Sequence, residues 1–178
     1  MKQILLLSGY ARSGKDSVAN LLEEEHGFRR FAFADALKEM VAERTGIPVS
    51  LFHSLQKDSL IGLPGSSKTY RDLLIEVADK ERAVDPDIFS RIVAAQIRES
   101  GADRVVISDW RYKREETFLR SWLDPAIYLV RRGRVVRSSV TPSDTPIEHD
   151  LDGEPMDIVI QNDGSISALR DALALLSQ

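Results

Sequence analysis

The sequence predicts an α/β fold in which a five-stranded parallel sheet is covered by helices on both faces. Short apolar runs of strand type alternate along the chain with longer segments of helical spacing, which is typical of this architecture. The length of 178 residues is close to that of one ordinary domain, and the sequence contains no internal repeat. A single domain over residues 1–178 is therefore expected.

The first strand leads through a glycine-rich turn into the first helix. Residues 4–7 are Ile-Leu-Leu-Leu, and the turn from Gly9 to Lys15 has the pattern Gly-x4-Gly-Lys. Glycines at these positions let successive N–H groups converge on phosphate oxygens, and the helix N-terminus adds partial positive charge. Lys15 is expected to reach the β and γ phosphates. The loop residues expected to bind a nucleotide are Gly9, Ala11, Arg12, Ser13, Gly14, Lys15, Asp16 and Ser17.

Asp16 departs from the usual form of this turn. Such loops mostly carry a serine or threonine after the lysine, and its hydroxyl binds Mg²⁺. A carboxylate is also a hard oxygen ligand, and a hydroxyl follows one place later at Ser17. We therefore predict Asp16 and Ser17 as metal ligands, together with Asp109 at the end of the third strand.

The remaining elements follow in order along the chain. Further strands are expected at 28–34, 105–109, 126–130 and 158–160. Further helices are expected at 35–45, with Asp35 as its N-cap, at 69–80, from 85–87 to Gly101, at 113–123, and from Ser165 onwards. Two segments lack apolar periodicity and are expected to be mobile: an acceptor-side loop at about 47–68 and a lid at about 131–155.

Charged residues stand where the carboxyl ends of the strands are expected, which is where ligands gather in such sheets. Asp109 could orient Mg²⁺ or accept a proton from an attacking oxygen, and it could equally cap the next turn. Arg111 suits a phosphate group, with a surface salt bridge as the alternative. Asp35 and Lys38 are candidates for the second substrate, as is Arg71 in the first turn of its helix.

A run of arginines follows the fourth strand. Arginines that close over a γ-phosphoryl group recur in phosphoryl transfer, whereas a solvated charge run is the commoner explanation for such clusters. We interpret this run as catalytic, with Arg131 and Arg132 nearest the site. His149 could order the lid, contact the substrate or be structural.

Composition limits the partners. A formal net charge of -4 and a pI near 5.5 argue against a nucleic-acid polymer as ligand. The absence of cysteine excludes disulfides, thiolate zinc sites and cysteine nucleophiles. No apolar run approaches the length of a signal-peptide core or a membrane span. A soluble, cytoplasmic protein that binds small molecules and no membrane is therefore expected.

Five motifs together resemble the phage and viral deoxynucleoside monophosphate kinases, a family of P-loop kinases. They span nearly the whole chain in the family's order, at residues 9–17, 33–38, 70–74, 107–112 with Glu115, and 162–165. One departure is Arg114 before Glu115, where the family tends to carry Asn. The segment Ser13-Gly14-Lys15-Asp16 is also similar to phosphomevalonate kinases of the animal type.

The resemblance implies a three-layer P-loop kinase fold with a closing lid, and a homodimer. It implies that ATP, with Mg²⁺, binds the Gly9 loop, with Asn162 to Gly164 near the adenine. A nucleoside monophosphate would bind on the side of Asp35, Arg71 and Arg111. The expected reaction is transfer of the γ-phosphoryl group of MgATP to a (deoxy)nucleoside monophosphate, in the cytoplasm of the host if the chain is viral. The alternatives are a phosphomevalonate kinase-like enzyme and a nucleotide-dependent binding switch.

Overall fold

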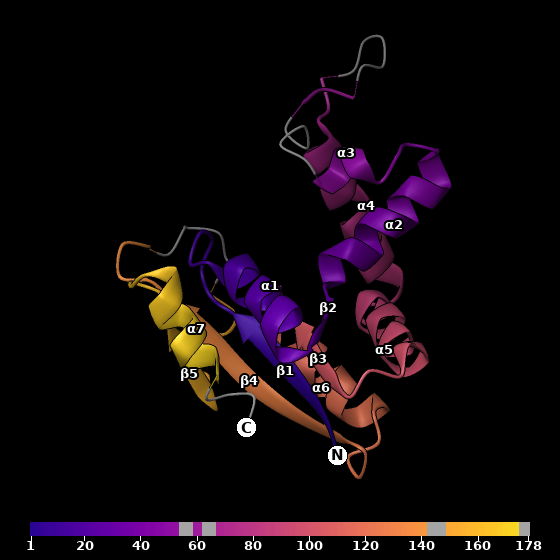
Figure 1. Cartoon of the computed structure of the whole chain (residues 1–178). Coiled ribbons are helices and arrows are strands. Elements are labelled where there is room, and N and C mark those ends of the chain that lie inside the picture. Colours follow the sequence, from indigo (N-terminus) through magenta and orange to yellow (C-terminus); the bar gives the residue numbers. More distant parts are fainter. Residues whose placement is uncertain (54–58, 62–66, 142–148, 175–178) are drawn as a thin grey trace.

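A five-stranded parallel sheet forms the centre of the computed structural model, which describes residues 1–53, 59–61, 67–141 and 149–174 (Figure 1). The strands lie in the order β2-β3-β1-β4-β5, and each neighbouring pair is parallel. Their bounds are β1 Lys2–Ser8, β2 Arg29–Phe31, β3 Arg104–Ile107, β4 Tyr128–Val136 and β5 Ile158–Gln161. The fold class expected from the sequence is confirmed.

Helices cover both faces of the sheet, as three layers require (Figure 1). They are α1 Lys15–His26, α2 Phe33–Thr45, α3 Ser50–His53, α4 Tyr70–Val84, α5 Ile88–Ser100, α6 Lys113–Trp122 and α7 Ile166–Ala174. The central strand β1 explains the layering, because alternate side chains point to opposite faces. Leu5 and Leu7 pack with α1 and α7, whereas Ile4 and Leu6 pack with α2, α5 and α6.

An arm of three helices stands beside the sheet (Figure 1). It consists of α2, the short helix α3 and α4, and the ring of Phe52 in α3 packs edge-on against Tyr70 at the start of α4. Thr69 and Asp72 form a capping box at the N-terminus of α4. Of the acceptor-side loop expected at 47–68, the structure describes α3 and a bridge between Leu60 and Thr69, and residues 54–58 and 62–66 lie outside the described residues.

Two expected boundaries are wrong. The fourth strand does not end at Val130: β4 continues to Val136, because it pairs with β1 on one side and with β5 on the other. Residues 131–136 therefore belong to the sheet and not to a lid, and residues 142–148 of the expected lid lie outside the described residues. Helix α2 begins at Phe33, so Asp35 lies in its first turn and is not its N-cap.

The helices of the described residues include none that is both long enough and apolar enough to cross a membrane. At 13 residues, the apolar helix α5 is well short of a span, and its apolar side, with Phe89, Val93 and Ile97, is buried in the core. Its apolar character is therefore explained by packing against the sheet.

The capping box makes a stability prediction for the arm. In Thr69→Ala, α4 loses the hydroxyl that accepts the Asp72 N–H at 3.1 Å. We expect the free energy of unfolding to fall by about 1 kcal/mol, measured by urea denaturation. The control is Thr117→Ala, which removes a hydroxyl bonded to the Lys113 carbonyl within α6; an equal loss in both variants would contradict a capping role.

Candidate functional site

The glycine-rich turn forms a tight loop between β1 and α1. Gly9 and Gly14 have φ angles of 141° and 96°, in a region that side chains rarely adopt. A Cβ on Gly14 would lie 2.0 Å from Asn162 Nδ2, and one on Gly9 would lie 2.4 Å from the Val135 carbonyl oxygen. Arg12, at the tip, has a positive φ of 66°. At these two glycines the loop thus has room for backbone only, which suits a close approach to phosphate.

Lys15 folds back over this loop. Its Nζ donates hydrogen bonds to the carbonyl oxygens of Gly9 at 2.7 Å and Tyr10 at 2.9 Å. Ser13 is buried beneath, and its Oγ has no hydrogen-bond partner among the described residues. An ammonium and a buried hydroxyl at the loop suit a ligand with several acceptor oxygens.

Asn162 binds the loop from the end of the edge strand β5. It follows β5 and donates from Nδ2 to the Ser13 carbonyl at 2.9 Å, while its backbone N–H donates to the Val136 carbonyl. The family resemblance implied that Asn162 to Gly164 lie near the adenine; in the structure Asn162 contacts the phosphate loop itself. The adenine contact stays a prediction.

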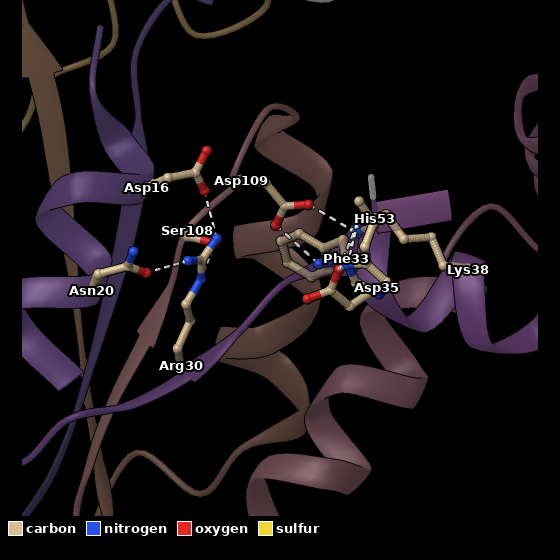
Figure 2. A network of polar contacts seen from close by, with 10 residues as sticks. Asp16, Asn20, Arg30, Phe33, Asp35, Lys38, His53, Ser108 and Asp109 are labelled. Carbon is tan, nitrogen blue, oxygen red and sulfur yellow. Dashed lines mark hydrogen bonds and ion pairs between the residues drawn. The ribbon is translucent and has the colours of Figure 1, made fainter. Parts of the chain in front are cut away.

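Asp16 and Ser17 are exposed at the start of α1. The Asp16 carboxylate is 81% exposed and forms an ion pair with Arg30 of β2 (Figure 2). Within the described residues, no group of three acidic, histidine or cysteine side chains could hold a metal without further ligands. One carboxylate and one hydroxyl nevertheless fit Mg²⁺, which is commonly bound through one or two carboxylates plus substrate phosphates.

Asp109 lies just beyond the carboxyl end of β3 and caps a helix of the arm rather than the next turn. Its two oxygens accept the backbone N–H groups of Phe33 at 2.9 Å and Ala34 at 2.8 Å (Figure 2). Burial raises the pKa of the Asp109 carboxyl, and the two hydrogen bonds oppose that rise. This distant cap explains why α2 begins at Phe33. The metal and proton-acceptor roles of Asp109 stay predictions.

Asp35 and Lys38 meet on the first two turns of α2. Lys38 Nζ donates to Asp35 Oδ1 at 2.7 Å, and His53 Nδ1 lies 3.7 Å from the same oxygen (Figure 2). His53 was not predicted from the sequence, because only folding brings α3 against α2. Arg71 lies in the exposed first turn of α4, on the arm.

A cavity of about 210 Å³ opens beside the phosphate loop. Its lining includes four basic residues and no acidic residue of the described chain; the basic residues are Lys15, Arg111, Arg134 and Arg137. Arg134 donates a hydrogen bond from Nη2 to the Leu151 carbonyl oxygen, and its buried Nε has no partner in the part of the chain that the structure describes. The cavity is therefore suited to anionic groups.

Arg131 and Arg132, the two arginines expected nearest the site, lie within the sheet. Both belong to β4, in register with Leu5 and Leu6 of β1, and neither lines the cavity. Arg132 instead pairs with the buried Glu116 at 2.7 Å. The members of the basic run that line the cavity are Arg134 and Arg137, because the strand is longer than expected. The catalytic role of the run stays a prediction.

Asp152, near the end of the expected lid, is hydrogen-bonded to Tyr10 of the phosphate loop. It accepts from the Tyr10 hydroxyl at 2.8 Å, and its other oxygen lies 2.7 Å from His149 Nδ1. Arg134 lies 3.6 Å away, and the rings of Tyr10 and His149 are in contact. His149 thus contacts Asp152 within this segment, and the role of His149 in ordering a lid stays a prediction. Asp152 was not predicted from the sequence.

This geometry can be set beside the proteins that the chain resembles. The sequence has no match among curated proteins. Residues 7–124, about two thirds of the chain, match the family model of phosphomevalonate kinase. The chain belongs to the phosphomevalonate kinase family.

Solved structures similar to this family member share its fold. TT1252 from Thermus thermophilus is 17% identical with a TM-score of 0.54, covering 98% of this chain and 96% of that one. A protein from Chloroflexus aurantiacus, proposed to be a kinase, is 14% identical with a TM-score of 0.52, covering 98% and 95%. Dephospho-CoA kinase from Campylobacter jejuni is 14% identical with a TM-score of 0.49, covering 99% and 96%. The two structures with TM-scores above 0.5 show that this fold is shared, and they show nothing of the substrate.

Membership of the phosphomevalonate kinase family supports an ATP-dependent phosphotransferase. The sequence showed similarity to this family only around Ser13 to Asp16, and the match extends it to residues 7–124. The narrower resemblance to deoxynucleoside monophosphate kinases stays a prediction, as does the homodimer.

The buried carboxyl of Glu115, at the edge of the site, should make the stability of the fold depend on pH. Burial raises the pKa of its carboxyl to about 8, although the N–H groups of Arg111 and Tyr112 both donate to it. The folded state therefore holds this proton more tightly than the unfolded state, and the associated stability is lost as pH rises from about 4.5 to about 8. Glu115→Gln keeps an accepting oxygen and cannot ionise.

We expect denaturant unfolding at pH 5 and pH 9 to separate the two proteins. Between pH 5 and pH 9, the free energy of unfolding of the parent should fall by roughly 2–4 kcal/mol more than that of Glu115→Gln, since one pKa unit corresponds to about 1.4 kcal/mol. Parallel pH profiles of the two proteins would show that Glu115 ionises normally.

Proposed function

We propose that this protein is an ATP-dependent kinase that transfers the γ-phosphoryl group of ATP to a (deoxy)nucleoside monophosphate. The observation that carries this proposal is the cavity that Lys15 and three arginines line, with no acidic residue of the described chain in its lining. One basic side chain is enough to bind many anions. Four basic side chains beside a phosphate loop suit a reaction in which the donor and the acceptor both carry phosphate.

The chemistry assigns a task to each group. An oxygen of the acceptor phosphate attacks the γ-phosphorus, the bond from that phosphorus to the β–γ bridging oxygen breaks, and ADP leaves with the electron pair. Positioning and charge neutralisation supply most of the catalysis in such reactions. Lys15 would hold the β and γ phosphates, and Arg111 would hold the acceptor phosphate. Arg134 and Arg137 would neutralise charge on the transferred group, the task first expected of Arg131 and Arg132.

Mg²⁺, when bound, offsets the negative charge that develops on the phosphates during transfer. Asp16 and Ser17 would hold it together with the nucleotide. Their oxygens are exposed beside Lys15, which is the position that a metal shared with phosphate requires.

A second cavity supports an acceptor with a flat ring. It has a volume of about 400 Å³ and is lined by Phe89 and Tyr112, with the Arg82 guanidinium over both rings. Tyr112 directly follows Arg111, so the phosphate site and this aromatic wall belong to one loop. Aromatic faces and guanidinium planes are common partners of nucleobases.

Phosphomevalonate is the second candidate acceptor, because the family model that matches residues 7–124 is that of phosphomevalonate kinase. Its carboxylate would need a cation at the second cavity. Lys113 and Arg114 line this cavity but already pair with Glu154 and Asp87, and Arg82 lies over the two aromatic rings. Because aromatic faces suit a nucleobase and offer nothing to a carboxylate, we rank the nucleotide as the first candidate.

A coupled assay of ADP release decides among the acceptors. The panel contains the four common deoxynucleoside monophosphates, the corresponding ribonucleotides and phosphomevalonate. The proposal expects turnover with at least one nucleotide; turnover with phosphomevalonate alone would transfer the assignment to the second candidate. Tight ATP binding without any acceptor-stimulated turnover would instead indicate a binding switch. Lys15→Ala is the control and should abolish transfer while the circular-dichroism spectrum is unchanged.

The two proposed acceptor arginines make a further prediction. Arg111→Ala and Arg71→Ala should raise the KM for the acceptor tens-fold and leave ATP affinity nearly unchanged, because a lost charge-assisted hydrogen bond costs about 1.5–3 kcal/mol. Arg98→Ala, which removes a guanidinium lying over the Trp122 ring, is the matched control. Weakened ATP binding with normal acceptor use would place the substituted arginine on the donor side.

A further inference from the structure

Arg30 is the residue of β2 that reaches the phosphate loop. Its guanidinium donates from Nε to Ser108 Oγ at 3.1 Å and from its two terminal nitrogens to Asn20 Oδ1 and Asp16 Oδ1, each at 2.5 Å (Figure 2). One side chain thus joins an edge strand, the end of β3 and the first helix. Three partners at once hold the guanidinium plane in a fixed orientation.

Helix α1 presents one polar face to this single arginine. Asp16, Asn20 and Glu23 are spaced four and three residues apart, so they lie on the same side of the helix. Glu23 Oε1 accepts the backbone N–H of Arg30 at 3.2 Å. The Arg30 side chain is 27% exposed, against 81% for Asp16. Arg30 is therefore the fixed member of the ion pair, and Asp16 is the member that faces the ligand side.

Only one oxygen of Asp16 is used by this contact. Oδ1 accepts from Arg30, whereas Oδ2 has no hydrogen-bond partner within the described part of the chain. Figure 2 shows Oδ2 pointing away from the guanidinium. An oxygen with free lone pairs beside the phosphate loop can accept from water or approach a cation.

We propose that Arg30 is a positioning residue that holds Asp16 by Oδ1 and so presents Oδ2 to the metal-bound nucleotide. The inference rests on the ATP-dependent function proposed above. The guanidinium also offsets the negative charge that Asp16 would otherwise bring near the phosphates. A loop with serine or threonine after its lysine has no charge to balance. Asp16 and Arg30 therefore act as one unit in this chain.

The test measures binding of ATP alone, by calorimetry, in EDTA and at rising Mg²⁺ concentration. In Arg30→Met, metal-free ATP should bind more weakly, and the Mg²⁺ concentration that gives half of the gain in affinity should rise on the order of tenfold, the loss expected for one charge-assisted contact. Asp16→Asn should raise this Mg²⁺ concentration by a similar factor. The double variant should need no more Mg²⁺ than either single variant, because Arg30 acts through Asp16.

Two variants sharpen the comparison. Arg170→Met removes an ion pair of 2.7 Å between α7 and Glu25 at the other end of α1, and it should stay within about twofold of the parent. Arg30→Lys keeps the charge but cannot reproduce the planar three-way contact. It should restore metal-free ATP binding and leave the Mg²⁺ dependence impaired.

The outcomes separate this inference from the proposed function. An additive effect in the double variant, or a lowered melting temperature with parental Mg²⁺ dependence in Arg30→Met, would overturn the positioning role. A parent protein that binds no ATP with or without Mg²⁺ would overturn the proposed function itself. Mg²⁺-dependent ATP binding in the parent that Arg30→Met leaves unchanged would overturn the inference alone.

Discussion

The hydrogen bond from Asn162 to the Ser13 carbonyl is the contact on which the geometry of the site depends. It fastens the loop after the central strand β1 to the end of the edge strand β5, across the full width of β4. The approach is so close that Gly14 has no room for a Cβ. The shape of the loop therefore follows from the register of three strands, and the loop in turn sets where α1, Lys15 and Asp16 begin.

Charge is arranged around this loop in pairs. Asp16 faces Arg30, Asp35 faces Lys38, and Asp152 accepts from Tyr10 near Arg134. The lining of the cavity beside Lys15 contains four basic and no acidic residues of the described chain, although the formal net charge of the whole chain is -4. The overall charge of the chain thus says little about the sign of the field in its site.

The fold and the phosphate loop could be predicted from the sequence because both are local patterns. Apolar runs marked the strands, and the Gly9 to Lys15 spacing marked the loop. The errors have one physical origin in contacts between residues far apart in the chain. The α2 cap comes from Asp109, which is 76 positions from Phe33. Likewise, β4 includes the basic residues after Val130 because it pairs with β1 and β5 there; the basic run alone gives no strand signal.

The site was predicted less completely, for the same reason. Lys15 and Arg111 follow from motifs and do line the cavity. Arg134 and Arg137 belong to the basic run, but only the length of β4 determines which members reach the cavity. Arg30, His53 and Asp152 carry no motif at all. They are recognised only when β2, α3 and the segment after residue 148 are seen against their partners.

The Asp109 cap has a mechanical consequence for the arm. A half-buried carboxylate bonded to two N–H groups of the first turn anchors that end of α2 to the end of β3. Releasing it would leave the carboxylate and both N–H groups without these hydrogen bonds, which is costly. Any swing of the arm toward the phosphate loop must therefore turn about this fixed end. The tip that carries α3 would travel farthest, while Asp35, two residues from the anchor, would scarcely move.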